Sequence, residues 1–301
     1  MFYVPSARVD QETEITSAVT SQNHDILNAF TVDVEDYYHV QSFADRIDPA
    51  RWDDYESRVV ANTHKMLRIL DEHQTHGTFF ILGWVADRFP QLVRDIQHAG
   101  HEIGCHSYWH KLIYKMKPEE FRDDLRHARD LLQDITGEPV VAYRAPSFSI
   151  TNDSLWALDI LIEEGFQYDS SIFPIHHDNY GIPNAERFPH RIAKNGSSLW
   201  EFPPSVHRLL HLNIPIAGGG YFRLYPAWLS IHWLRRVNRV HNQPFIFYVH
   251  PWELDPDQPR LPGSLKSRFR HYQNLRRTET KLGHLLRSFK LGSLSKAFPH
   301  G

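Results

Sequence analysis

Cysteine is almost absent from this sequence: the 301 residues include one, Cys105. A single cysteine excludes an intramolecular disulfide and any zinc site built from several cysteines. One cysteine does not decide whether the protein is in an oxidising or a reducing compartment, but it slightly favours the reducing cytosol. We expect Cys105 to be a buried, inert thiol and not a nucleophile, because sequence neighbours in a strand, here Cys105 and His106, point to opposite faces.

Long apolar segments are missing as well. No run approaches the roughly 18 residues needed to span a bilayer. The first residues, MFYVPSARVDQETEIT, lack the basic-then-apolar pattern of a secretory signal. We therefore expect a soluble, cytoplasmic protein, with the inner face of the membrane as an alternative location.

The chain has no large excess of charge of one sign. Its formal net charge is −3 and its pI about 6.7, so no global basic field would draw it to nucleic acid. Only the segment after the proline-rich stretch 255–263 is strongly basic, with nine lysines and arginines against the single acid Glu279. Such a run is typical of a solvated helix face, and contact with anionic lipid or polymer is the alternative. The oligomeric state is left open.

What the sequence does contain is a regular alternation of strand-like and helical segments. Residues 1–24 are polar and aperiodic and are expected to form a flexible leader. Strand-like runs then begin with ILNAFTVDV, GTFFILG, HEIGCH, VVAYRAPSF, FQYDSSIFP, SLWEFPPS and FIFYVHPWE, with helical patterns between several of them. This order predicts an α/β protein with a mainly parallel sheet, and allows a closed barrel.

Polar residues cluster where these predicted strands stop. They are Asp33, Glu35, Asp36, His106, His110, Arg144, Asp169 and His250. In parallel α/β architectures, sites are built at the C-terminal ends of the strands. We therefore expect these residues to converge, although they are spread over more than 200 positions.

Two of these residues, His106 and His110, are four positions apart. On a helical turn this spacing places both imidazoles on one face, where they can bind one metal ion. Alone the pair is a weak signal in a chain with 21 histidines. It gains weight from TVDVED, in which three carboxylates follow a strand within four residues; an exposed acidic turn is the alternative there. One carboxylate and two histidines would leave open positions on a divalent ion, as in a catalytic site.

The motifs TVDVED, HSYWH, YRAPSF, YDSS and FYVHPWE resemble, in order and approximate spacing, the five motifs of the polysaccharide deacetylases, the NodB-homology or carbohydrate esterase family 4 group. The resemblance covers roughly residues 26–255. DVEDYYHV, GGGYFRLYP and FRHYQNLRRTE look like a subgroup associated with bacterial exopolysaccharide and exosortase gene clusters. The resemblance implies a distorted (β/α) barrel of about seven strands over 25–255. Residues 256–301 are then expected to be a basic helical extension packed on the barrel.

The resemblance also implies residue roles. It makes Asp33 the general base, Arg144 the residue that orients this base, and His250 the general acid, with Asp169 supporting the acid. The metal ligands it implies are Asp36, His106 and His110. Familiar members have two adjacent aspartates, whereas Val34 and Glu35 separate Asp33 from Asp36 here, so Glu35 is an alternative ligand to the favoured Asp36.

The expected function is that of a metal-dependent hydrolase. It would remove N-acetyl groups from N-acetylhexosamine units of a bacterial exopolysaccharide or its precursor, with zinc favoured and cobalt, nickel and manganese as alternatives. Two rivals remain open at this point. One is an amidohydrolase of small cyclic amides, resembling allantoinases or imidases. The other is a catalytically silent glycan-binding protein.

Overall fold

The computed structural model describes residues 26–178, 180–194 and 196–298. The leader expected at 1–24 lies outside the described residues. The strands are β1 (Leu27–Val34), β2 (Thr78–Ile81), β3 (Glu102–Cys105), β4 (Ala142–Tyr143), β5 (Tyr168–Asp169), β6 (His190–Lys194), β7 (Ser197–Glu201), β8 (Val206–Leu209), β9 (Leu212–Pro215), β10 (Ile246–Val249) and β11 (Lys290–Gly292).

The α-helices are α1 (Val59–Glu72), α2 (Gly83–Arg88), α3 (Pro90–His98), α4 (Pro118–Thr136), α5 (Trp156–Glu163), α6 (Gly219–Leu224), α7 (Ala227–His241), α8 (Leu265–Tyr272), α9 (Leu275–Ser288) and α10 (Leu294–Ala297). Short 3₁₀ helices are η1 (Gln41–Phe43), η2 (Pro49–Asp54), η3 (Ile113–Lys115), η4 (Pro146–Phe148), η5 (Asn152–Ser154) and η6 (Pro251–Leu254).

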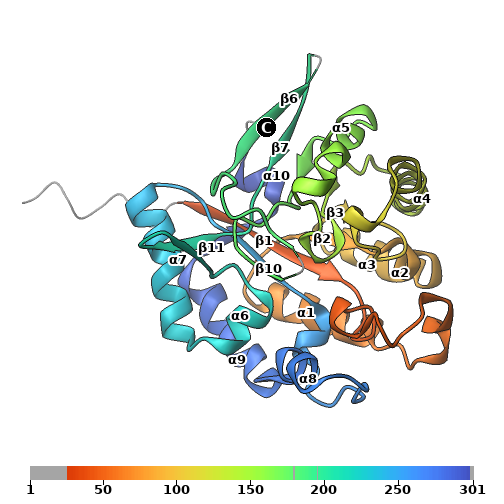
Figure 1. Ribbon diagram of the computed structural model, residues 1–301. Helices are drawn as coiled ribbons and strands as arrows, with labels where there is room; N and C mark the ends of the chain where they lie inside the picture. The colour runs from red at the N-terminus through yellow and green to blue at the C-terminus, as the bar shows by residue number, and fades with distance from the viewer. Residues whose placement is uncertain (1–25, 179, 195, 299–301) are drawn as a thin grey trace, which may run out of the picture.

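The main sheet confirms the predicted α/β class. Its strands follow the order β10-β1-β2-β3-β4-β5-β7-β6, and every pair from β10 to β7 is parallel. The strand β6 pairs antiparallel with β7, and the two project together at the top of Figure 1. The parallel part of the path thus has seven strands, surrounded by helices.

The sheet curves but does not close. Among the described residues, β10 and β7 do not pair as strands. The segment after β7 bridges the opening instead: Ser205 Oγ accepts the N–H of Ile246 at 2.9 Å, and Gly218 forms an isolated bridge with Tyr248. The barrel is therefore distorted at this position, because single contacts replace a ladder of hydrogen bonds.

The glycine run before α6 fits this bridge. Gly218 has a φ of +142°, a region that only glycine occupies readily, and a Cβ atom there would lie 1.8 Å from the carbonyl oxygen of Tyr248. Gly219 approaches the ring of the same tyrosine. The glycines therefore allow the backbone to lie directly against β10.

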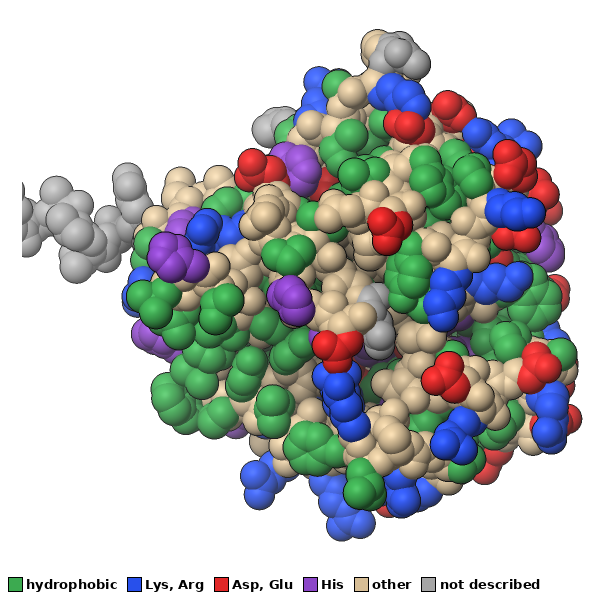
Figure 2. Space-filling view, in the orientation of Figure 1, with side chains coloured by type: hydrophobic (Ala, Val, Ile, Leu, Met, Phe, Trp, Pro, Cys, Tyr) green, Lys and Arg blue, Asp and Glu red, His purple; other side chains and the backbone are tan. Residues whose placement is uncertain are grey.

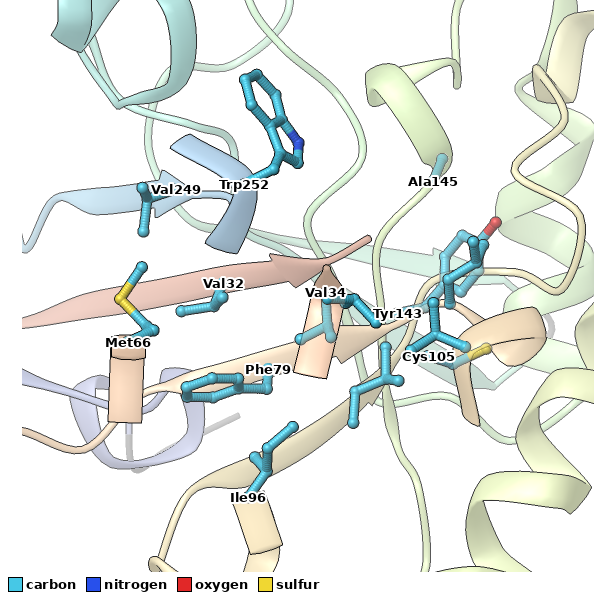
Figure 3. Packing of buried hydrophobic residues seen from close by; sticks show 14 of the residues in the cluster. Val32, Val34, Met66, Phe79, Ile96, Cys105, Tyr143, Ala145, Val249 and Trp252 are labelled. Carbon is cyan, nitrogen blue, oxygen red and sulfur yellow. The ribbon is translucent and has the colours of Figure 1, made fainter. Parts of the chain in front are cut away.

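Side-chain alternation along β1 separates core from site. Val32 and Val34 pack outward into the main hydrophobic cluster, which includes Phe79 of β2 and Met66 of α1 (Figure 3). Successive side chains of a strand point to opposite faces, so Asp33 points inward. The same strand therefore holds the helices on one face and supplies the site on the other.

The segment after residue 255 is in contact with the rest of the chain. β11 pairs in parallel with the start of β1, and α9 packs against α7 and η6. None of the helices in the described ranges is both long enough and apolar enough to cross a membrane.

Candidate active site

A cavity of about 420 Å³ lies at the C-terminal ends of the parallel strands. Five predicted or alternative site residues line it: Asp33, Glu35, His106, His110 and His250. They come from the end of β1 and the residue after it, from the loop after β3 and from the residue after β10. The predicted convergence of these strand ends is therefore present in the structure.

The carboxylate beside the two histidines is that of Glu35. One ligand atom from each of Glu35, His106 and His110 lies within 4.8 Å of the others, and all three side chains are buried. Glu35 Oε2 is 2.6 Å from His110 Nε2 but makes no hydrogen bond of acceptable geometry. A buried carboxylate oxygen without a donor is costly, and a cation among these three groups would satisfy it.

The histidines meet through a loop and not through a helical turn, unlike the prediction. Ser107 and His110 have positive φ angles of +62° and +53°, which interrupt any helix. Asp124 of α4 holds the loop by accepting the N–H groups of Tyr108, at 2.8 Å, and Trp109, at 3.2 Å. The convergence of the two imidazoles thus depends on a carboxylate from a neighbouring helix.

His106 is arranged as a metal ligand usually is. Its Nδ1 atom lies 2.8 Å from the carbonyl oxygen of Arg144, so Nδ1 carries the proton and Nε2 is the free acceptor. Burial lowers the pKa of His106 to about 4, which keeps the ring neutral. Burial opposes the charge of Glu35, but its electrostatic interactions with His110 and His250 hold the pKa of Glu35 below its usual range.

Asp36, the favoured carboxylate ligand, has a different position. Its Oδ2 atom accepts a hydrogen bond from Ser57 Oγ at 2.8 Å and from the backbone N–H groups of Arg58, at 2.8 Å, and Val59, at 3.1 Å. These groups form the N-terminus of α1, where free N–H donors attract a carboxylate. The expectation for Asp36 is therefore corrected: it caps a helix, and Glu35 lies with the histidines.

Arg144 lies beside Asp33, as the sequence indicates. Its Nη1 atom donates to Asp33 Oδ1 at 2.6 Å and to Thr31 Oγ1 at 2.8 Å, while Nε and Nη2 donate to the carbonyl and hydroxyl oxygens of Ser170. The guanidinium is fully buried, so this paired and hydrogen-bonded arrangement is what makes its charge tolerable. Asp33 is left with Oδ2 directed to the cavity side, 3.8 Å from His250 Nε2.

The carboxylate that supports His250 is Glu253 and not Asp169. His250 Nδ1 lies 2.7 Å from Glu253 Oε1, and its Nε2 lies 3.6 Å from Glu35 Oε1. Burial opposes a charge on His250, but the hydrogen bond to Glu253 and the charge of Glu35 outweigh it and raise the pKa of His250 to about 9. The histidine is therefore positively charged near neutral pH.

Asp169 pairs with a second buried acid. Its Oδ1 atom accepts a hydrogen bond from Ser171 Oγ, while its Oδ2 atom and Glu201 Oε2 are both buried without a hydrogen-bond donor. Burial raises the pKa of Asp169 to about 6. Burial and then the charge of Asp169 raise that of Glu201 well above its usual range. The pair therefore shares at least one proton, and the predicted role of Asp169 at His250 is corrected.

A buried arginine completes the support of His250. Arg223 of α6 donates from Nε to Glu253 Oε2 at 2.5 Å and from Nη1 to the carbonyl oxygen of His271 at 2.5 Å. Its remaining donors reach the carbonyl oxygens of Arg270 and Gln273. The motifs GGGYFRLYP and FRHYQNLRRTE, noted in the sequence without a role, thus meet at this arginine.

Cys105 is buried, and burial raises the pKa of its thiol to about 12. The expectation that Cys105 is buried is thereby confirmed. Of the aromatic residues within the site motifs, Phe148, Tyr248 and Trp252 line the cavity. Trp252 stacks on the ring of His250 and also donates from Nε1 to Glu35 Oε1 at 3.2 Å, which connects His250 to the cluster of Glu35, His106 and His110.

Two family models match the chain. Residues 51–162 match the model described as "Polysaccharide deacetylase", and residues 170–299 match the "Domain of unknown function (DUF3473)". The first range contains His106, His110 and Arg144, and the second contains His250 and its supporting residues. Asp33 and Glu35 precede both ranges, so each range supplies only part of the site.

Comparisons with individual proteins agree with the first model. The chain is 34% identical over 98 residues to a peptidoglycan-N-acetylglucosamine deacetylase of Bacillus cereus, a match that covers 32% of this chain and 36% of the relative. The chain spans about a third of the length of the curated relatives it matches.

Solved structures share the fold along almost the whole chain. A crystal structure described as a putative polysaccharide deacetylase from Mycobacterium smegmatis matches with a TM-score of 0.60 at 21% identity, covering 99% of this chain and 94% of that one. The Puue allantoinase matches with a TM-score of 0.58 at 13% identity, covering 97% of each chain. At these identities the likeness shows the fold alone. The family model, the relatives and the motifs agree that the chain contains a polysaccharide deacetylase domain.

Proposed function

We propose that this protein is a metal-dependent deacetylase that removes the acetyl group from N-acetylhexosamine units of a glycan, with a bacterial exopolysaccharide or its precursor as the natural substrate. The observation that carries the proposal is the position of Asp33 and His250 beside the Glu35–His106–His110 cluster in one cavity. Each of the groups that amide hydrolysis requires has a candidate among these residues.

Glu35, His106 and His110 are the proposed metal ligands. One carboxylate and two imidazoles suit zinc, and also cobalt, nickel or manganese. The donor set fits a cation because Glu35 Oε2 is buried without a hydrogen-bond donor. A divalent metal ion held there would supply Lewis-acid chemistry: it polarises a carbonyl group and makes water a stronger nucleophile at neutral pH.

The protein's own residues would move the protons. Arg144 fixes one oxygen of Asp33, so the other oxygen can accept the proton of the attacking water. His250 is protonated near neutral pH, and Glu253 holds its Nδ1, so Nε2 can donate a proton to the departing amine. An amine leaves readily only when protonated, which is why a charged histidine is useful in this position.

The cavity favours a glycan over a small cyclic amide. About 420 Å³ is more space than one small ring fills, and the aromatic faces of Phe148, Tyr180, Tyr221, Tyr248 and Trp252 along it suit sugar rings. Asp33 and His250, the proposed base and acid, are both present in the cavity, and this argues against a catalytically silent binding protein. We also propose that the chain divides into a catalytic barrel at 25–255 and an extension at 256–301. The two parts are in contact, because carbonyl groups of the extension accept hydrogen bonds from Arg223 of the barrel.

The test is acetate release from N-acetylglucosamine oligomers, measured on the protein as purified, after chelation, and after zinc or cobalt is added back. We expect metal-dependent release that falls by at least about 10²-fold in His110→Ala. The matched control is His98→Ala, at an exposed histidine on α3.

Other outcomes would identify the rivals. Release of ring-opened product from allantoin or a cyclic imide, without acetate release, would establish the small-amide reaction. Tight oligomer binding by the metal-loaded protein without release of any product would establish a silent glycan-binding protein.

A further inference from the structure

Exposed apolar side chains gather in one part of the molecule. Ten large apolar side chains are exposed among the described residues, and eight of them lie between residues 209 and 269. These eight, which we call the apolar rim, are Leu209, Leu210, Leu212, Leu224, Trp228, Val240, Leu265 and Phe269. They belong to the β8–β9 hairpin and to α6, α7 and α8. Figure 2 shows hydrophobic side chains gathered at the lower left, over the region of α6 and α7 in Figure 1.

The charge around the rim is mainly positive. The sequence contains no aspartate or glutamate from Phe202 to Trp252, a stretch with five arginines. Four of these arginines are exposed: Arg208, Arg235, Arg236 and Arg239. On α8, Lys266, Arg268 and Arg270 continue the basic character, with Asp178 as an acidic partner of Lys266 at 2.9 Å. This part of the surface is therefore both apolar and basic, although the whole chain has a net charge of −3.

The hairpin tip bears an apolar side chain at a position that suits glycine or asparagine. Leu210 has a φ of +54° and is 85% exposed. A bulky residue in the left-handed region is strained, and an exposed leucine gains nothing from the core. Neither feature serves the fold, so an external contact of this side chain would explain both.

The apolar rim adjoins the mouth of the catalytic cavity. Leu224 and Phe269 belong to the rim and also line the cavity, as do Lys266 and Arg270. Whatever covers the rim therefore lies beside the entrance through which a substrate reaches His250.

We propose that the apolar rim and its arginines dock on an anionic lipid bilayer. Leucine and tryptophan side chains interleaved with arginine and lysine are the composition of surfaces that lie in the membrane interface. Anionic headgroups complement a surface without exposed acids between residues 202 and 252. The contact is peripheral, and it extends beyond the basic tail to the hairpin and α7.

The docked orientation has a consequence that rests on the proposed function. With the cavity mouth beside the bilayer, the enzyme would take its N-acetylated glycan at the membrane surface, as expected for a glycan attached to a lipid carrier. Binding to the bilayer does not require catalysis. The proposed docking can therefore be wrong while the proposed deacetylation is right, and the reverse also holds.

The first test is co-sedimentation of the full chain with vesicles of phosphatidylcholine alone or with phosphatidylglycerol added. We expect binding that requires phosphatidylglycerol and weakens with salt. Replacing Arg235, Arg236 and Arg239 by glutamine should lower the partition coefficient by about 100-fold, at about fivefold per charge. Leu210→Asn together with Trp228→Ser should also lower it, while Leu155→Ser, at an exposed leucine before α5, should not.

The second test locates the contact. Cys105 is buried, so a cysteine introduced by Leu210→Cys can be labelled selectively with an environment-sensitive fluorophore. We expect a blue shift on anionic vesicles, and none for the same label at Leu155→Cys. Acetate release from soluble oligomers should be unchanged in Leu210→Asn, because Leu210 does not line the cavity.

Three results would overturn the proposal. The first is no binding to anionic vesicles at low salt, and the second is binding that none of the rim variants alters. The third is self-association in sedimentation equilibrium that Leu210→Asn abolishes, because the rim would then be an interface between copies of this chain.

Discussion

The Nδ1 atom of His250 lies 2.7 Å from Oε1 of Glu253, three residues further along the chain. The second oxygen of Glu253 is held by Arg223, and carbonyl groups of residues 270, 271 and 273 hold the arginine in turn. Glu253 and Arg223 do not belong to the residues predicted from the family motifs. The proposed acid is therefore positioned by the C-terminal part of the chain, within the region that matches a domain of unknown function.

Glu253→Gln should lower kcat for deacetylation by about 10²-fold and leave KM nearly unchanged. The carboxylate holds His250 in the tautomer and charge state that can donate from Nε2, while Glu253 itself does not line the cavity. Steady-state kinetics on N-acetylglucosamine oligomers measures both constants. Nitrogen chemical shifts of the His250 ring report the tautomer independently of activity.

Glu56→Gln, at an exposed glutamate before α1, is the control for this variant. A Glu253→Gln enzyme with wild-type kcat and unchanged His250 shifts would show that Glu253 only fills space beneath the histidine.

Glu35→Gln and Asp36→Asn should differ in metal content. Glu35→Gln removes the proposed ligand charge, so stoichiometric zinc should be lost. Asp36→Asn weakens the cap of α1 at Ser57 and Val59, so zinc should be kept and the free energy of unfolding should fall by about 1 kcal/mol. Elemental analysis and denaturant titration measure these quantities. Zinc loss in Asp36→Asn with zinc retained in Glu35→Gln would restore Asp36 as the ligand.

Arg223→Ala should lower the free energy of unfolding by about 3–5 kcal/mol, because it leaves the buried Glu253 carboxylate without its partner. Arg223→Lys should cost less, since lysine keeps the charge but cannot reach Glu253 and the carbonyl groups of 270–273 together. Urea titration gives both values. Arg239→Ala, at an exposed arginine of α7, should stay within about 0.5 kcal/mol of wild type. Equal effects for Arg223→Ala and Arg239→Ala would contradict the buried clamp.

Most of the parallel sheet could be predicted from the sequence, because its strands are apolar runs separated by helices of regular spacing. β1, β2, β3 and β10 lie where their patterns place them, and α3 and α4 end near the expected glycines. The hairpin β8–β9 and α7 were not predicted. Their exposed faces carry leucine, tryptophan and valine, so the alternation of buried and exposed positions that identifies such elements is weakened.

The sequence motifs predict which residues meet at the site, but they do not predict all of the contacts between them. Asp33 and Arg144 lie at the ends of β1 and β4, and His106 and His110 lie in the loop after β3, where the motifs place them. The choice between Glu35 and Asp36 depends on how the backbone turns after Val34 and on where α1 begins. The partner of His250 depends on the 3₁₀ turn η6, which brings Glu253 back to the histidine. Neither local turn is encoded in residue spacing alone.

In the wild-type protein we expect the free energy of unfolding to decrease as pH rises, and Glu201→Gln should remove most of this decrease. In the unfolded chain Asp169 and Glu201 lose their protons near pH 4. In the folded protein the pKa of Asp169 is raised to about 6, and that of Glu201 is raised well above its usual range. Between these limits the folded state binds more protons than the unfolded state, so the free energy of unfolding decreases as pH rises, by up to about 1.4 kcal/mol per pH unit for one proton.

A glutamine at 201 can donate its amide to Asp169 without taking up a proton, so the stability of Glu201→Gln should change much less between pH 5 and pH 8. Urea titrations at pH 5, 6, 7 and 8, with equal metal content, measure the slope. Glu138→Gln, at an exposed glutamate, should keep the wild-type slope. An equal slope in Glu201→Gln would mean that the two carboxyl groups do not share a proton, and that the buried pair beneath Ser171 is held by other donors.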